Sequence, residues 1–205
     1  MSLNVMVLES EHGAADEATR ELTEAGHVVL RCHDPGAPAF PCRGILDEST
    51  CPLRAQVVDV ALAVRSRVRS QPAPTEDGVR CALMSHVPLV VAGPSALDPY
   101  DGLETRVIDR IYDVVATCEA AAAAELPAHA RRATAVLADA MGEHRESRAN
   151  ASVSVTRRDG GLRVEVMGLG DATRDERQAA VVRVVGALRQ FDRSARSIDV
   201  IIGPG

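Results

Sequence analysis

Short apolar runs alternate with helix-like segments in the first half of the chain, and this alternation most limits the possible folds. The runs, each of strand length, cover residues 3–8, 27–31, 57–64 and 88–93. They are as continuously apolar as strands that are buried on both faces. Strands separated by helices pair in parallel through right-handed crossovers. We therefore predict a doubly wound parallel α/β domain over residues 1–124.

The segments between these runs have the periodicity of helices. Residues 13–25 place apolar side chains at helical spacing, and Gly26 follows where a C-terminal glycine of a helix is common. A short helix is predicted at residues 76–86. The longest helix is predicted at residues 103–124, with Cys118 on its buried stripe.

The second half of the chain predicts a separate α+β module of order αββαβ over residues 125–205. The predicted elements are a helix at 128–146, strands at 149–156 and 162–166, a helix at 173–191 and a strand at 198–202. The apolar stripe of the second helix comprises Ala179, Val182, Val185, Leu188 and Phe191. The hairpin around Asp159-Gly160 is distantly similar to a domain of the alkaline-shock protein family, and such modules often mediate assembly.

Residues 1–120 resemble the receiver domain of response regulators. The resemblance lies in the first strand ending at Glu9-Ser10-Glu11, in Gly26-His27-Val28-Val29, and in the fourth strand at residues 88–92. It implies a flavodoxin-like sheet and matches Glu9 and Glu11 to the acidic pair that holds Mg²⁺ in that family.

The chain departs from the receiver pattern at the residues that carry phosphotransfer. The place of the phosphate-accepting Asp holds Ala63, Val64 or Arg65, and the place of the Ser or Thr falls near Gly93. The family's lysine has no counterpart, because the chain contains no lysine. The resemblance therefore implies a pseudo-receiver that keeps the scaffold and lacks phosphotransfer.

A proline-rich loop at residues 31–53 carries Cys32, His33, Cys42 and Cys51. Its prolines and glycines are incompatible with a regular helix. Cys32 leaves the second strand and Cys81 lies in the early part of the helix after the third, so both can face the carboxyl edge of the sheet. Four thiolates could bind zinc or an iron–sulfur cluster there, with His33 as a spare ligand.

Two other interpretations of these cysteines stay open. Cys42 and Cys51 could form a redox pair, or the thiols could simply be buried or incidental. Glu9 or Glu11 with a cysteine could instead serve an enzyme at the carboxyl edge. The remaining histidines form no ligand pair, and His129 and His144 are expected on an exposed helix face.

Composition excludes several functions. All 23 basic residues are arginine, which rules out a lysine-dependent phosphate loop and a lysine Schiff base. The net charge of -6 and four Phe or Tyr residues argue against general nucleic-acid binding. No apolar run is long enough to span a bilayer and no leader is evident, so we expect a cytoplasmic protein.

These observations together predict a non-enzymatic regulatory or interaction protein. Its cysteine loop would respond to a metal, a cluster or the redox state, and a protein partner or a second copy would receive the signal. The alternatives are an enzyme with a carboxylate and thiol site, and a dimerising scaffold.

Overall fold

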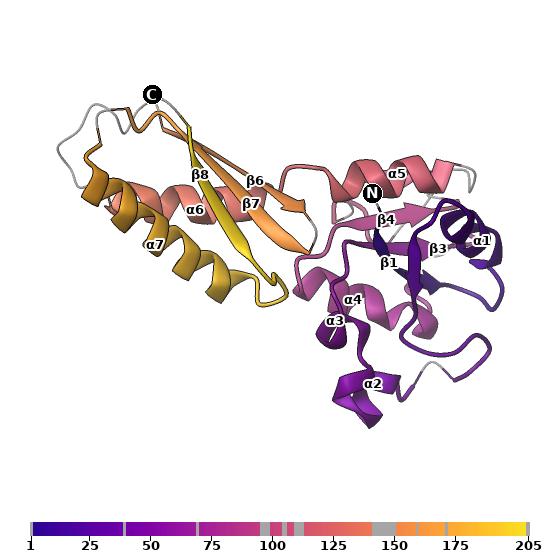
Figure 1. Cartoon of the computed structure of the whole chain (residues 1–205). Helices are drawn as coiled ribbons and strands as arrows, with labels where there is room; N and C mark the ends of the chain where they lie inside the picture. Colours follow the sequence, from indigo (N-terminus) through magenta and orange to yellow (C-terminus); the bar gives the residue numbers. More distant parts are fainter. Residues whose placement is uncertain are drawn as a thin grey trace. The chain divides into compact units, whose positions relative to one another are not determined.

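The computed structural model describes the chain except for residues 1, 39, 69, 95–98, 104–105, 109–112, 141–150, 159, 171 and 204–205. The chain forms two compact units, Met1–Ala122 and Ala123–Gly205 (Figure 1). Each unit has its own sheet and its own apolar core. None of the helices in the described part of the chain is long and apolar enough to cross a membrane.

The first unit is built on an all-parallel sheet with the strand order β2-β1-β3-β4-β5. Its strands are β1 (Asn4–Glu9), β2 (Val28–Leu30), β3 (Val60–Val64), β4 (Leu89–Ala92) and β5 (Arg106–Ile108). The prediction of an α/β fold on a parallel sheet is confirmed.

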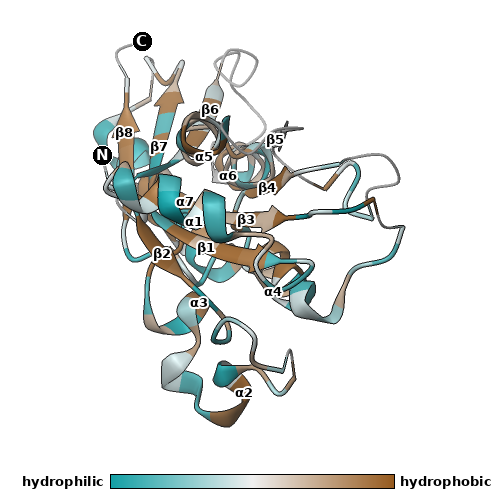
Figure 2. Ribbon diagram, turned by 90° about the vertical axis from the view of Figure 1, so that its right-hand side faces the viewer, coloured by the Kyte–Doolittle hydropathy of each residue, from teal (hydrophilic) through white to brown (hydrophobic). Residues whose placement is uncertain are grey.

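Helices cover both faces of this sheet. On one face α1 (Asp16–Glu24) and α5 (Val114–Ala122) bury Leu22 and Cys118 in a core with the strands. On the other face α4 (Asp77–Met84) packs through Val79. The two faces explain why β3 and β4 are apolar at every position, and why the central strands are brown along most of their length in Figure 2.

The prediction of one helix over residues 103–124 is wrong. Residues 106–108 form β5, which pairs with β4 from Val90 to Ala92, and the helix begins only at Val114. Leu103, expected on the buried stripe, is 59% exposed. Local periodicity could not reveal β5, because a three-residue strand at a sheet edge is fixed by its neighbour.

The second unit carries a mixed sheet of order β6-β7-β8. Its elements are α6 (Pro127–Ala140), β6 (Ser152–Arg158), β7 (Gly161–Met167), α7 (Arg174–Phe191) and β8 (Ile198–Ile202). The hairpin of β6 and β7 is antiparallel, while β8 returns parallel to β7 through α7. Both helices pack against the same core residues of the sheet, among them Val155 and Val164.

A buried polar cluster joins three elements of the second unit. His129 of α6 lies 3.0 Å from Asp192, which follows α7, and Arg157 of β6 donates to the same carboxylate at 2.6 Å. The expectation that His129 is exposed is wrong, because only 2% of it is accessible. His144 lies outside the described residues.

Candidate functional site

The cysteine loop contains three single turns of helix: α2 (Arg43–Leu46), a 3-10 turn at Glu48–Thr50 and α3 (Pro52–Ala55). Cys42 immediately precedes α2 and Cys51 immediately precedes α3. The amide of Arg43 donates to the carbonyl of Cys32 at 3.3 Å, which closes the start of the loop. As the prolines and glycines predicted, the described part of the loop forms only short turns, and these turns place its thiols.

Two glycines make room for the sulfur atoms. A Cβ built on Gly78 of α4 would lie 3.0 Å from the Cys32 Sγ, and one on Gly44 of α2 would lie 3.3 Å from the Cys51 Sγ. The Cys32 Sγ also lies 3.7 Å from the Met6 Sδ. Cys32 is therefore wedged between β1 and α4, while Cys51 packs against the backbone of α2.

Cys32 and Cys81 each lie within electrostatic reach of both loop thiols, Cys42 and Cys51. Burial raises the pKa of the Cys32 thiol to about 12, and the nearby thiols of Cys51, Cys42 and Cys81 add to the effect. The pKa of Cys81 is raised by burial and then by Cys51 and Cys42. The structure thus gathers thiols from the loop and from α4 at one side of the sheet.

The gathered thiols are not yet arranged as a formed metal site. All five cysteines are free thiols. Among the residues that the structure describes, no three His, Cys, Asp or Glu side chains are close enough to hold a metal ion as they stand. Coordination would therefore require side-chain rotation or movement of the loop.

His33 is engaged with the segment that precedes α4. Its Nε2 lies 3.4 Å from the carbonyl oxygen of Thr75, while its buried Nδ1 has no hydrogen-bond partner. With Nε2 bonded to a carbonyl, only Nδ1 is available as a ligand. Cys118 takes no part in this region, since it is buried in the core and burial raises its pKa to about 12.

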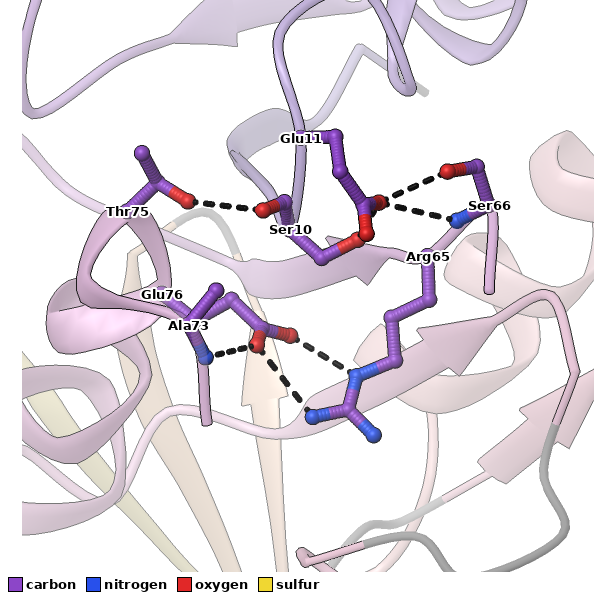
Figure 3. A network of polar contacts seen from close by, with 7 residues as sticks. All are labelled: Ser10, Glu11, Arg65, Ser66, Ala73, Thr75 and Glu76. Atoms are coloured by element: carbon purple, nitrogen blue, oxygen red, sulfur yellow. Dashed lines mark hydrogen bonds and ion pairs between the residues drawn. The ribbon is translucent and has the colours of Figure 1, made fainter. Parts of the chain in front are cut away.

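The carboxylates at the carboxyl edge have structural partners. Glu9 accepts hydrogen bonds from the amides of Gly13 and Ala15, at 3.1 and 3.3 Å, and so holds the turn that leads into α1. Glu11 accepts from the Ser66 hydroxyl at 2.7 Å and also contacts Ser10 (Figure 3). The two acids point to separate partners and do not form a shared site.

A buried ion pair follows β3, where the receiver resemblance would put the phosphate-accepting Asp. Arg65 donates through Nε and Nη2 to the two oxygens of Glu76, at 2.8 and 3.2 Å (Figure 3). The amide of Ala73 donates to the same carboxylate at 2.7 Å, and Tyr100 lies 5.0 Å from the guanidinium. Sequence patterns do not predict this pair, because Arg65 and Glu76 lie in different segments and meet only on folding.

The loop and the carboxyl edge are physically connected. A Cβ built on Gly36 would lie 3.3 Å from the His12 ring, so the loop packs closely on the segment after β1. Thr75, which His33 contacts, donates its hydroxyl to the Ser10 carbonyl at 3.2 Å (Figure 3). A displacement of the loop would therefore disturb the edge network.

No protein-family model, curated protein or solved structure matches the chain. Its function is therefore argued from its own residues.

Proposed function

We propose that the chain is a non-enzymatic regulatory protein whose cysteine loop binds zinc or an iron–sulfur cluster, or senses the redox state. A single observation carries the proposal: Cys32 of the loop and Cys81 of α4 each lie within electrostatic reach of both Cys42 and Cys51. Four cysteines are a complete ligand set for tetrahedral zinc or for a cluster.

A bound cation would compensate the charge of a Cys32 thiolate. Burial, and to a smaller extent the neighbouring thiols, raises the pKa of the Cys32 thiol, so a metal ion that displaces its proton would have to supply this compensating charge. Gly44 and Gly78 leave space at Cys51 and Cys32 that any side chain would fill. In the redox form of the proposal, Cys42 and Cys51 lose two protons and two electrons to a peroxide and form a disulfide.

A receiver-like scaffold without phosphotransfer fits the first unit. The strand order β2-β1-β3-β4-β5 supports the flavodoxin-like arrangement that the resemblance implies. Arg65 and Glu76 are paired at the position of the missing acceptor, and Glu9 and Glu11 are held by structural hydrogen bonds. These pairings favour a regulatory function over an enzyme at the carboxyl edge.

Metal or cluster binding would join the loop to α4, because three ligands come from the loop and one from the helix. The bound state would then hold the loop, and the contacts of Gly36 and His33 would carry the change to the carboxyl edge. A protein partner that contacts the loop would distinguish the two states.

Anaerobic purification followed by elemental analysis and an absorption spectrum tests the proposal. We expect about one zinc per chain, or iron with sulfide and a visible absorption band. Cys51→Ser and Cys81→Ser should lose the metal. Gly44→Ala should reduce metal content although it removes no thiol, because its Cβ would lie 2.7 Å from the Cys51 Cβ.

Cys118→Ala is the matched control, and it should keep the metal because Cys118 lies in the apolar core. If the protein is colourless and metal-free but forms a Cys42–Cys51 disulfide with peroxide, metal binding is refuted and only redox sensing remains. If the protein also forms no disulfide, and Cys42→Ser and Cys51→Ser behave like the parent, the sensing function is refuted.

A further inference from the structure

The outer edge of β8 is an unprotected strand edge. One edge of β8 pairs with β7, and no strand in the described part of the chain pairs with the other. The strand reads Ile-Asp-Val-Ile-Ile, so it has one charged residue, no proline and no lysine. Exposed strand edges of monomeric proteins usually carry prolines, lysines or several charges, because an edge without them can pair with a strand of another chain.

The opposite edge of the same sheet is partly covered. Glu125 forms a bridge with Thr156 of β6, and the amide of Leu126 donates to the Val155 carbonyl at 2.7 Å. The two edges therefore differ, and in the described part of this unit only β8 offers its full length. A contact made through β8 would leave no second full-length edge of this three-stranded sheet, as far as it is described, for further growth.

We propose that β8 pairs antiparallel with β8 of a second copy of this chain, which joins the two three-stranded sheets into one. The pairing is isologous, so the same edge is used in both copies and this contact closes as a dimer. The proposal does not depend on the cysteine site, which lies in the other unit.

The register of β8 against β7 determines which groups face outward. The Leu162 amide donates to the Ser197 carbonyl and the Gly203 amide donates to the Val166 carbonyl, both at 2.9 Å. In a parallel ladder the backbone groups of alternate residues face the same neighbour, so these two bonds place the amides and carbonyls of Asp199 and Ile201 toward β7 as well. The amides and carbonyls of Ile198, Val200 and Ile202 therefore face the open edge.

One antiparallel register uses all of these groups. When Val200 lies opposite Val200 of the second copy, Ile198 lies opposite Ile202, and every outward group of the strand gains a partner. A register centred on Asp199 would place two carboxylates opposite each other, which is unfavourable. The Val200-centred register instead places Asp199 opposite Ile201.

The open face beside β8 complements that register. A hollow of about 430 Å³ is lined by Arg158, Leu162, Arg163, Ser197, Asp199 and Ile201. In the Val200-centred register, Asp199 of each copy lies between its own Arg163 on β7 and Ile201 of the second copy, so no like charges lie directly opposite each other across the new ladder. Ile201 and Met167 are 43% and 44% exposed, and the second copy would cover part of this apolar surface.

Sedimentation of the full chain over a range of concentrations tests the proposal. We expect the wild type to form a dimer, and Val200→Pro to raise the dissociation constant at least about tenfold. The Val200 amide faces outward, so proline removes an edge donor and leaves the ladder with β7 intact. Val200→Thr keeps the amide and the branched side chain and should still dimerise.

Hydrogen exchange provides a second measurement if Val200→Pro does not fold. The amides of Val200 and Ile202 should exchange slowly in concentrated wild-type protein and faster on dilution. A wild-type chain that stays monomeric at high concentration would overturn the proposal. The open edge of β8 would then be a candidate site for a strand of another protein. Equal dimerisation of folded Val200→Pro would also overturn it. Cysteine variants that lose metal should still dimerise.

Discussion

At the scale of single residues, the Asp192 carboxylate holds the second unit together. It is 2% exposed and accepts hydrogen bonds from His129, Arg157 and Ser194. Burial by itself would raise the pKa of Asp192, but the bond from His129, the charge of Arg157 and the bonds from Ser194 outweigh burial and hold the pKa well below its usual range. The carboxylate is therefore charged in the folded state.

Asp192→Asn should destabilise the second unit by about 3 kcal/mol, because it leaves the buried guanidinium of Arg157 without its counter-charge. Urea unfolding followed by circular dichroism measures the change. Asp139→Asn, on the exposed side of α6, is the control and should change the free energy of unfolding by less than about 0.5 kcal/mol. Equal stability of the two variants would contradict the assigned function of Asp192.

The same carboxylate predicts an acid dependence of stability. Its folded pKa is lower than the unfolded value of 3.8, so its contribution is fully present above that value and is lost as the pH falls below it. Unfolding of the wild type from pH 6 downward should therefore show a loss of stability below about pH 4. In Asp192→Asn this loss should be smaller.

At the scale of elements, α4 and α7 each contain a glycine, one closely packed against neighbouring atoms and the other facing open space. A Cβ built on Gly78 of α4 would lie 2.6 Å from a methyl carbon of the buried Leu8 and 3.0 Å from the Cys32 Sγ. A Cβ built on Gly186 of α7 would have nothing within 4 Å. Alanine is the better helix former at both positions, so any difference in outcome reports the tertiary contact.

Gly186→Ala should raise the free energy of unfolding by up to about 1 kcal/mol, because the methyl group meets no atom and the unfolded chain loses freedom. Gly78→Ala should lower it by about 1–3 kcal/mol through overpacking against Leu8 and Cys32. Thermal and urea unfolding of the two variants measure the signs. Stabilisation by Gly78→Ala would mean that the helix moves away at little cost.

At the scale of the whole molecule, the chain has two separate sets of core residues. The cores of the first unit lie on the two faces of the parallel sheet and contain no residue from beyond Ala122. The core of the second unit runs from Leu126 to Ile202. Because a unit with its own core can fold alone, the halves should not need each other for stability.

Fragments 1–122 and 123–205 should therefore each fold when expressed alone. Circular dichroism should show cooperative thermal unfolding for both, and the fragment 123–205 should keep the dimerisation that we assign to β8. Metal binding should stay with the fragment 1–122. An unfolded fragment would contradict the independence of the units, and a monomeric but folded fragment 123–205 would count against the β8 contact.

The sequence by itself determined the elements whose signal is local. Continuous apolar runs predicted β1, β2, β3 and β4 of the parallel sheet, because a strand covered on both faces is largely apolar along its length. Alternation and a turn signal predicted the hairpin, and the strand at Ile198–Ile202 has the predicted bounds. The cysteines could be proposed as site residues because thiol chemistry depends on residue type.

Only the tertiary structure decided the partners of those elements. β5 exists through its pairing with β4, and Val182 of the predicted apolar stripe is 62% exposed while Val184 is buried. Likewise, His129 is buried where it bonds with Asp192, which is distant in sequence. Gly44 and Gly78 matter because the sulfur atoms of Cys51 and Cys32 pack against them in the fold. The physical reason is the same in each case: periodicity encodes which residues avoid water, whereas packing, charge pairing and close approach depend on neighbours that the chain acquires only on folding.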